Sequence, residues 1–388
     1  MKKILYGVAL LLALLATGCG DANQKTSALL QIDVRTNYPE KEICLQDVAE
    51  VSYIPLDSKD DILFSGHVGS FSDKGIAIFD ASNQRLLFFD KQGKFLNFVG
   101  RKGQGPEEYS MMFSVLVDWD KNEVMVFNSY GQSVVYSLDG TFKRRVTLES
   151  DVNPSDVYKW SDGQFVSYRG GVLDEDGKLE LYQPIVFYSR EAGKMEDSLS
   201  YRREHEFPVI IANGSMNMKI SYPSLVKLNG NVYVNDLSAD TIYRLVSPTK
   251  ALQPVITRTP SVVDDEDGYF MDLYGITSQF YIFWFRSRQL SFDGGNFRVI
   301  DEKGKNAIYD RNNGQVYHPK FINKDYPSME KCELRFSEEV HACATMQFEA
   351  FELIEALEAG ELSGELKTIA EGLKEDDNPV LMVVKFKE

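Results

Sequence analysis

The 388-residue sequence is poor in the residues and motifs that many hydrolytic enzymes use. It has four histidines and four cysteines, and it contains neither the Gly-x-Ser-x-Gly elbow of serine hydrolases nor the His-Glu-x-x-His helix of zinc proteases. Neither the spacing of the cysteines nor the placement of the histidines matches a zinc site. We therefore predict no metal and no cofactor, and a non-catalytic protein is favoured.

Basic residues are also in the minority. The chain has 42 lysines and arginines against 58 aspartates and glutamates, and its formal net charge is −16. Proteins that bind nucleic acid or adhere to anionic lipid generally need a basic surface. The charge balance therefore argues against nucleic acid as a partner.

Two acidic clusters, at 174–177 and 264–268, resemble the middle of a calcium-binding EF-hand loop. Such a loop needs an oxygen ligand at its first position and a glutamate at its twelfth. Counting from the glycine of each cluster places a valine at the first position and no glutamate at the twelfth. Both clusters are therefore predicted to be solvated turns.

A long apolar run occurs at the N-terminus, where Ile4 to Ala16 follow two lysines. This pattern is typical of a secretory signal and has the wrong length and flanks for a lasting membrane span. The residues before Cys19 resemble the lipobox of bacterial lipoproteins, in which the cysteine sulfur receives a diacylglycerol. We predict a signal peptide over 1–18 and a lipid on Cys19 that holds the mature chain on a membrane. An ordinary secreted protein is the alternative.

The remainder is predicted to contain a tether and one large domain. Residues 19–42 begin with a short, small and polar stretch that suits a tether between lipid and folded domain. The mature chain has about 370 residues, more than one compact core usually serves, so two domains or a repeat array is expected. We assign residues 43–388 to a repeat-built domain.

Three cysteines remain after lipidation: Cys44, Cys332 and Cys343. A hairpin turning at Ser337 and Glu338 would place Cys332 opposite Cys343, and an exported compartment permits a disulfide. That pair would lie at a hydrogen-bonded site, where the spacing is larger, and isolated cysteines are commonly buried thiols. Both alternatives, a disulfide between Cys332 and Cys343 and two free thiols, stay open.

Three stretches of sequence align without gaps, from Ile76, Val124 and Val232. Each contains a strand of alternating β-formers, an Asp or Asn suited to bonding backbone groups in a turn, and a second strand. The starts are 48 and 156 residues from the first, which fits blades of roughly 40 to 50 residues with modest insertions. The sequence therefore predicts an all-β fold, a six-bladed β-propeller of four-stranded antiparallel blades.

The two ends of the domain complete this prediction. Residues 43–56 are strand-like and are predicted to pair beside the final strand, which closes the ring and removes exposed sheet edges. Near the C-terminus the period becomes helical before Gly360, and a second helix is predicted over 366–373. These helices form a short insertion in the last blade. Four apolar residues share one face of the first helix: Phe348, Phe351, Ile354 and Leu357.

The chain resembles the six-bladed β-propeller lipoproteins of Bacteroidetes, which are relatives of proteins with NHL repeats. The resemblance implies the propeller fold and a location in the bacterial cell envelope, on the outer membrane and facing the periplasm or the surface. It implies no reaction. Five segments carry it: the lipobox at Cys19, YIPLD from Tyr53, FVGRKGQGPEEY from Phe98, DTIYRL from Asp240 and EDDNPVLMVVKFK from Glu375.

The glycine loop, residues 100–109, matches neither a phosphate-binding P-loop nor a dinucleotide fingerprint. In a propeller, the link between blades crosses the same face on which the turn between the second and third strands opens. The loop is therefore predicted to share a rim with turns of other blades, either as a binding surface or as a structural corner. The candidate binding residues are Arg101, Lys102, Gln104, Glu107, Glu108 and Tyr109, with Asn83, Tyr130 and Ser238.

The leading hypothesis is a monomeric, lipid-anchored binding or scaffold module for an unidentified peptide, glycan or protein partner. The alternative is a propeller hydrolase or lyase whose site lies in the central channel, where residues from separate blades can converge. The aromatic run at 280–285 could stack on carbohydrate. Packing between neighbouring sheets needs the same residues, and we favour a core role for this run.

Overall fold

The computed structural model covers most of the chain. It describes residues 29–59, 61–128, 131–149, 154–169, 172–173, 179–180, 184–201, 209–213, 216–220, 222–265, 268–293, 298–301 and 304–388. The predicted signal peptide and Cys19 lie outside these ranges.

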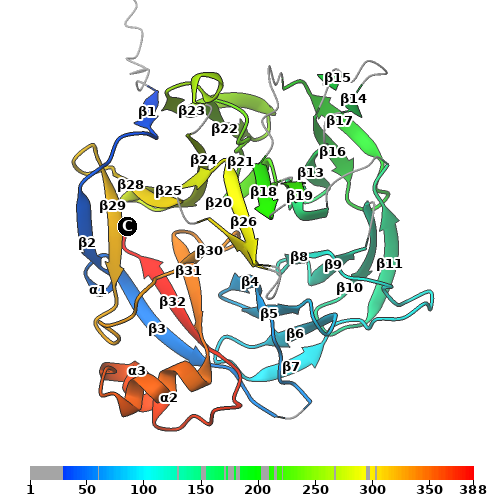
Figure 1. The fold of residues 1–388 in the computed structure, drawn as a ribbon. Coiled ribbons are helices and arrows are strands. Elements are labelled where there is room, and N and C mark those ends of the chain that lie inside the picture. The colour runs from blue at the N-terminus through cyan, green and yellow to red at the C-terminus, as the bar shows by residue number, and fades with distance from the viewer. Residues whose placement is uncertain are drawn as a thin grey trace, which may run out of the picture.

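Six antiparallel sheets are arranged as blades around a central axis, as Figure 1 shows, and this confirms the predicted six-bladed propeller. In chain order the first three blades contain β4 (His67–Ser72), β5 (Gly75–Asp80), β6 (Arg85–Phe89) and β7 (Phe95–Phe98); β8 (Ser114–Asp118), β9 (Glu123–Phe127), β10 (Gln132–Tyr136) and β11 (Phe142–Thr147); β12 (Val157–Lys159), β13 (Gln164–Tyr168), β16 (Ile185–Ser189) and β17 (Met195–Leu199). The last three contain β20 (Leu225–Leu228), β21 (Asn231–Val234), β22 (Thr241–Val246) and β23 (Ala251–Thr259); β24 (Tyr269–Ile276), β25 (Phe280–Ser287), β28 (Lys305–Asp310) and β29 (Gln315–Ile322); β30 (Arg335–Phe336), β31 (Cys343–Phe348), β32 (Val380–Phe386) and β3 (Ala49–Pro55).

The three aligned stretches form the second and third strands of blades one, two and four. Their turns have the predicted chemistry, because the Oδ1 of Asp80 accepts a hydrogen bond from the Asn83 amide at 3.2 Å and that of Asp236 accepts from the Ser238 amide at 2.9 Å. Asp310 accepts a comparable hydrogen bond from the Asn312 amide at 3.0 Å, but it does so in the turn between the third and fourth strands of blade five.

The hydrophobic core is divided into six clusters, and each lies between two adjacent blades. Between blades one and two, for example, Phe88 packs against Trp119 with ring centroids 5.5 Å apart, and Val126 and Tyr136 join them. Central strands are consequently buried on both faces and consist of continuous apolar residues.

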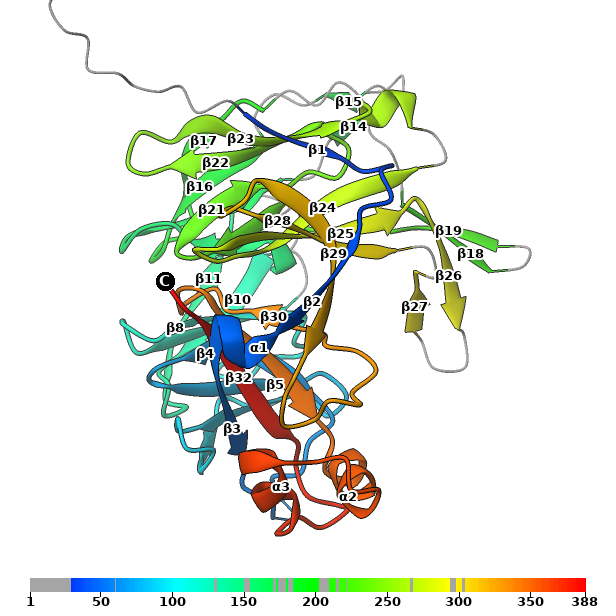
Figure 2. The same cartoon turned by 90° about the vertical axis from the view of Figure 1, so that its left-hand side faces the viewer.

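The N-terminal segment runs along three blades in succession (blue in Figures 1 and 2). β1 (Leu30–Asp33) pairs in parallel with β23, and β2 (Glu40–Cys44) pairs in parallel with β29. After α1 (Leu45–Val48), β3 pairs antiparallel with β32 from Ala49 opposite Phe386 to Pro55 opposite Val380. The predicted ring closure beside the final strand is confirmed, and strands also occur within the range assigned to the tether.

Blade five begins before the aromatic run at 280–285. Its inner strand is β24, and the aromatic strand β25 is the second of the blade. β24 was missed because it follows an acidic turn and carries a register shift between Leu273 and Gly275, which interrupts its alternation.

Two helices form the predicted insertion in the last blade, α2 (Ala350–Glu358) and α3 (Gly364–Ala370). The first ends as predicted, with Gly360 at a φ of +73°. Its predicted face is wrong, since Phe351 is 47% exposed. Phe348 is the last residue of β31, so counting it into the helix set the wrong phase. The buried residues of α2 are Ala350, Leu353 and Ala356.

The predicted cysteine hairpin also needs correction. β30 pairs with β31 in a register that places Arg335 opposite Thr345, so Cys343 does not lie opposite Cys332. Both are free thiols, as is Cys44. Burial first, with nearby carboxylates, raises the pKa of Cys332 and of Cys343 to about 12, so neither is a reactive thiolate at neutral pH.

Two further pieces of β-structure lie outside the six blades, and the sequence does not predict them. A four-stranded sheet outside the blades is built from β18 (Val209–Asn213) and β19 (Met216–Ile220), in the link between blades three and four, and from β26 (Gln289–Asp293) and β27 (Arg298–Ile300), in blade five. Figure 2 shows it protruding from one face of the ring, at the right. A small hairpin of β14 (Val172–Leu173) and β15 (Leu179–Glu180) lies between β13 and β16 of blade three. Among the described residues, no helix has the length and apolar character needed to span a bilayer.

Ring closure yields a stability prediction at Asn378. Its buried side chain accepts a hydrogen bond from the Phe64 amide at 3.1 Å and donates to the carbonyls of Asp57 at 2.7 Å and Ile62 at 3.1 Å. We expect Asn378→Ala to lower the free energy of unfolding by about 2 to 4 kcal/mol, because buried backbone groups lose their partners. Urea denaturation checks this. The exposed Asn312→Ala serves as control, and equal effects of the two substitutions would contradict the role of Asn378.

Candidate functional site

The glycine loop lies on the face that the sequence predicts. We call this the link face; it carries links between blades, such as 99–113, and turns between second and third strands, such as 81–84. The buried Tyr109 donates its hydroxyl hydrogen to the Gln84 carbonyl at 2.9 Å, and the Met112 amide donates to the Gln84 side chain at 2.6 Å. Loop and turn of blade one are therefore in direct contact.

Most polar groups of the glycine loop bond within the protein. The Arg145 guanidinium, from the outer strand of blade two, donates to the carbonyls of Gly105 at 3.1 Å, Pro106 at 2.8 Å and Glu108 at 2.7 Å. The Tyr136 hydroxyl donates to the next carbonyl of the loop, that of residue 107, at 2.6 Å. These bonds hold the loop against blade two and support its interpretation as a structural corner.

The loop side chains divide into two groups. The Glu108 carboxylate accepts a hydrogen bond from the Gly105 amide at 2.8 Å and pairs with Arg101 at 2.5 Å, and these two contacts hold the pKa of Glu108 below its usual value. The other charged or polar side chains are exposed and available to a partner: Lys102, Gln104 and Glu107.

The structure does not gather all predicted rim residues into one site. Asn83 lies in the turn next to the glycine loop, where its amide donates to Asp80 at 2.9 Å. Ser238 belongs to blade four, on the opposite side of the ring in Figure 1. Tyr130 lies outside the described residues. Among the described residues, the glycine loop and Asn83 therefore lie together at one corner of the ring, and Ser238 lies in a distant turn.

The corner yields a prediction about Arg145. We expect Arg145→Ala to speed hydrogen exchange of the loop amides by about tenfold, because three carbonyls lose their donor. Exchange detected by mass spectrometry over 100–109 measures it. Arg101→Ala is the control, since an exposed ion pair contributes little. Slow exchange in the Arg145 variant would show that the loop is held by other contacts.

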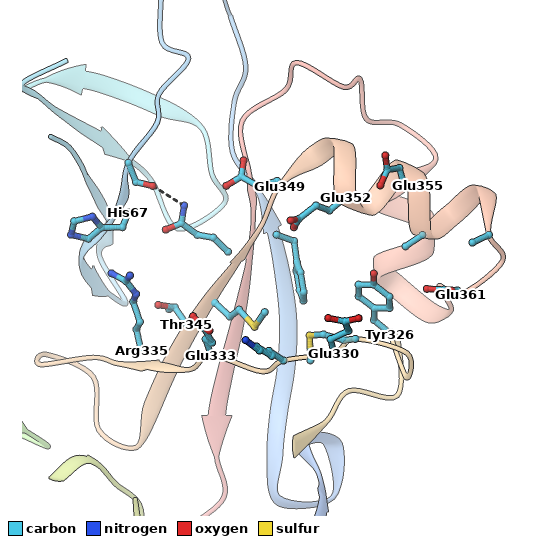
Figure 3. Close-up of a pocket in the computed structure, with 18 residues that line it drawn as sticks. His67, Tyr326, Glu330, Glu333, Arg335, Thr345, Glu349, Glu352, Glu355 and Glu361 are labelled. Atoms are coloured by element: carbon cyan, nitrogen blue, oxygen red, sulfur yellow. Dashed lines mark hydrogen bonds between the residues drawn. The ribbon is translucent and has the colours of Figure 1, made fainter. Parts of the chain in front are cut away.

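A cavity of about 670 Å³ opens on the link face between the helical insertion and blade six (Figure 3). We call it the acidic cavity. Its lining also includes apolar and aromatic side chains from Tyr326, Met329, Met346 and Phe348. Six glutamates line it, against one lysine and one arginine: Glu330, Glu333, Glu349, Glu352, Glu355 and Glu361, with Lys331 and Arg335.

Charge is distributed unevenly within the acidic cavity. Figure 3 shows Glu349, Glu352 and Glu355 along the helix side and His67 and Arg335 at the opposite end. Partial burial, and then the charge of Glu352, raise the pKa of Glu349. Burial, and then the charge of Arg335, lower the pKa of His67 and keep its ring neutral at pH 7. The helix side therefore attracts cations.

The second cavity, of about 640 Å³, lies beside the first, against blade five. We call it the blade-five cavity. Tyr274, Trp284, Asn306 and His318 line it, and its acidic and basic residues are equal in number. The charged residues are Glu40, Asp272, Glu330, Glu333, Arg286, Lys320, Lys331 and Arg335.

One segment separates the two cavities. Residues 323–334, the wall segment, link blade five to blade six and contribute to both linings. The buried Asn323 fixes its start, because its Oδ1 accepts hydrogen bonds from Gln46 at 2.7 Å and from the Tyr53 hydroxyl at 2.9 Å. That hydroxyl also contacts Asp325 at 3.0 Å, so the ring-closing strand β3 positions the wall.

Polar side chains from five blades line the central channel, a narrower space of about 280 Å³. Its lysines are paired, Lys227 with Glu339 at 2.8 Å and Lys159 with Asp118 at 3.1 Å. Enclosure by the channel, opposed by Lys227 and reinforced by Glu339, holds the pKa of Glu338 above its ordinary value, although channel solvent still reaches this side chain. Among the described residues, no group of three or more His, Cys, Asp or Glu side chains is arranged to hold a metal.

In the second acidic cluster, at 264–268, the Asp265 carboxylate pairs with Arg258 and Arg35.

Sequence reasoning missed both link-face cavities. One local signal was available, because Glu349, Glu352 and Glu355 recur every three residues and so lie along one side of a helix. The wall segment has no comparable pattern. Its residues meet blade five and blade six only through the closed ring.

The sequence matches a family described as a domain of unknown function, DUF4934, over residues 29–385. The chain belongs to this family. The match includes the N-terminal strands β1 and β2 as well as all six blades, so the DUF4934 unit is the whole closed propeller. No curated protein matches the sequence.

The chain is also similar to several solved structures. A protein of Bacteroides fragilis assigned as exported is 18% identical, with 92% of this chain and 99% of that chain covered and a TM-score of 0.63. A member of the DUF4221 family from Bacteroides vulgatus is 8% identical over 88% and 99%, with a TM-score of 0.49. Virginiamycin B lyase of Staphylococcus aureus is 11% identical over 86% and 99%, with a TM-score of 0.37. At these identities only the first comparison carries an argument, and it concerns the fold.

Proposed function

We propose that this DUF4934 protein is a non-catalytic binding module, held at the cell envelope by a lipid on Cys19. It binds a positively charged segment of a peptide or protein in the acidic cavity. The observation that carries this proposal is the acidic cavity itself, which combines six glutamates with apolar surface. The exported Bacteroides protein of the same fold supports a place outside the cytoplasm, which we assign to the outer membrane.

The chemistry of the acidic cavity favours a cationic segment. Long lysine and arginine side chains bury their methylene stems on apolar surface while the charged group stays near acids and water. The cavity offers both, with Met329, Met346 and Phe348 beside the glutamates. Its exposed acids attract a cation without the cost of burying a charge.

Removing charge from the helix side tests the binding site. We expect Glu352→Gln with Glu355→Gln to weaken binding of a labelled oligolysine peptide about tenfold, since each exposed pair contributes roughly 0.2 to 1 kcal/mol. Fluorescence anisotropy measures the affinity. The matched control is Glu107→Gln, which removes an exposed charge from the glycine loop on the same face. Equal loss in the control would indicate attraction to the overall negative charge, and the acidic cavity would not be the site.

The affinity should also depend on pH. Because the pKa of Glu349 is raised, this side chain takes up a proton at a higher pH than an ordinary glutamate. We expect oligolysine binding to weaken as the pH falls from 7 to 5, and Glu349→Gln to flatten that dependence. A pH titration of the anisotropy signal measures both, and an unchanged profile in the variant would exclude Glu349 as the titrating group.

The anchor has a separate test. We expect Cys19→Ala to move the full-length protein from the membrane fraction to the soluble fraction of an expressing bacterium, because the thioether-linked lipid can no longer form. Fractionation followed by immunoblotting measures this. A Cys44→Ala variant should stay with the membrane. Retention of the Cys19 variant would contradict the anchor.

A further inference from the structure

The face of blade five that points to blade six changes character along its strands. Side chains two apart in β25 share a face, and Phe280 and Ile282 pack with blade six in the core. Further along the same face, Trp284 and Arg286 line the blade-five cavity instead. The change occurs because β30, the inner strand of blade six, has two residues. Blade six therefore does not cover this end of blade five.

The polar groups on this uncovered surface are held in place. Asp272 bonds to Arg286 at 2.7 Å and accepts a hydrogen bond from Asn235 at 2.6 Å. The Arg286 guanidinium lies over the ring of Tyr222 at 4.4 Å. The indole nitrogen of Trp284 donates to Asp301 at 3.1 Å. A fixed arrangement of this kind lowers the entropy that a site loses when it binds a ligand.

A second chain of hydrogen bonds leaves one acceptor without a donor. The Tyr274 hydroxyl donates to the Asn306 side chain at 2.9 Å, and Nδ1 of His318 lies 2.7 Å from the Asn306 carbonyl. Since a carbonyl oxygen only accepts, Nδ1 carries a proton, and in this Nδ1–H tautomer Nε2 is an acceptor. Nε2 is buried and has no partner among the described residues, and the same holds for the donor Nε of Arg286.

Such unmatched polar atoms are uncommon in protein interiors and are costly there. Both belong to residues that line the blade-five cavity. Protein atoms cover both, and the rings of Tyr38 and Tyr222 lie against His318 and Arg286, so a ligand reaches these atoms only after neighbouring side chains shift. A ligand with hydroxyl groups could then satisfy both, because a hydroxyl is a donor and an acceptor.

We propose that the blade-five cavity is a second binding site, for an uncharged ring-shaped ligand with several hydroxyl groups, such as a monosaccharide unit. Equal numbers of acidic and basic residues give no preference for an ion. Trp284 offers an aromatic surface for the C–H groups of such a ring. The volume of about 640 Å³ is within the range of small-molecule sites. This inference goes beyond the proposed function, because the cavity and the ligand class are different.

The test uses the whole folded domain and a panel of free sugars: glucose, galactose, mannose, fucose and N-acetylglucosamine, with glucosamine and glucuronate as charged comparisons. We expect saturable binding of at least one neutral sugar by isothermal titration calorimetry or ligand-observed NMR. Trp284→Ala should weaken it by about tenfold or more, a usual scale for removing an aromatic contact at the centre of a site. The matched control is Trp160→Phe in blade three, which should bind normally.

A second variant protects the test against misfolding. A Cβ on Gly304 would lie 2.5 Å from Cζ2 of Trp284, so Gly304→Ala should displace the indole and weaken sugar binding while the ring stays folded. The Trp284 and Gly304 variants should both retain oligolysine binding, which separates this site from the acidic cavity. Failure of every neutral sugar to bind, tighter binding of a charged sugar, or full affinity in both variants would overturn the proposal.

Discussion

The structure depends on burial between neighbouring blades. The central strands of each blade are apolar on both faces of the sheet. All six core clusters join residues of adjacent blades. A single blade would expose both faces to water, so each needs a neighbour on each side and the array must close. The antiparallel pairing of β3 with β32 closes it, and Asn378 fixes the link that follows. β1 and β2 then cover the outer edges of blades four and five.

Closure also determines where function can be placed. The spacing between outer strands is fixed by close contacts, as at Gly93, which has a φ of +85° and where an added Cβ would lie 2.2 Å from the Pro55 carbonyl oxygen. With the blades fixed, length can vary only in links and turns. The wall segment, α2 and α3 all lie in such connections. Because these connections all lie on the link face, the acidic cavity and the blade-five cavity lie side by side there.

Much of the fold could be predicted from local sequence, because strand alternation and turn chemistry are local. Asp80 and Asp236 marked the repeated hairpin, and both make the expected turn bonds. The errors had different sources. The parallel pairing of β18 with β26 joins segments far apart in the chain and leaves no pattern within one strand. The hairpin of β30 and β31 is local, but its turn lies later in the chain than Ser337 and Glu338. The buried face of α2 was predicted wrongly because Phe348 was counted as helical. It is the last residue of β31, and α2 begins two residues later, at Ala350.

The candidate sites were harder to predict, because the most distinctive sequence and the largest cavities lie in different places. The glycine loop is distinctive because its backbone must turn sharply and pass close to blade two; Gly100 has a φ of +62° against the Tyr136 ring. The blade-five cavity instead occurs where the apolar alternation of a buried strand breaks. In β25 the stripe that begins with Phe280 and Ile282 continues with Trp284 and Arg286. A polar residue in such a stripe implies that the neighbouring blade ends before it, and that space can hold a ligand.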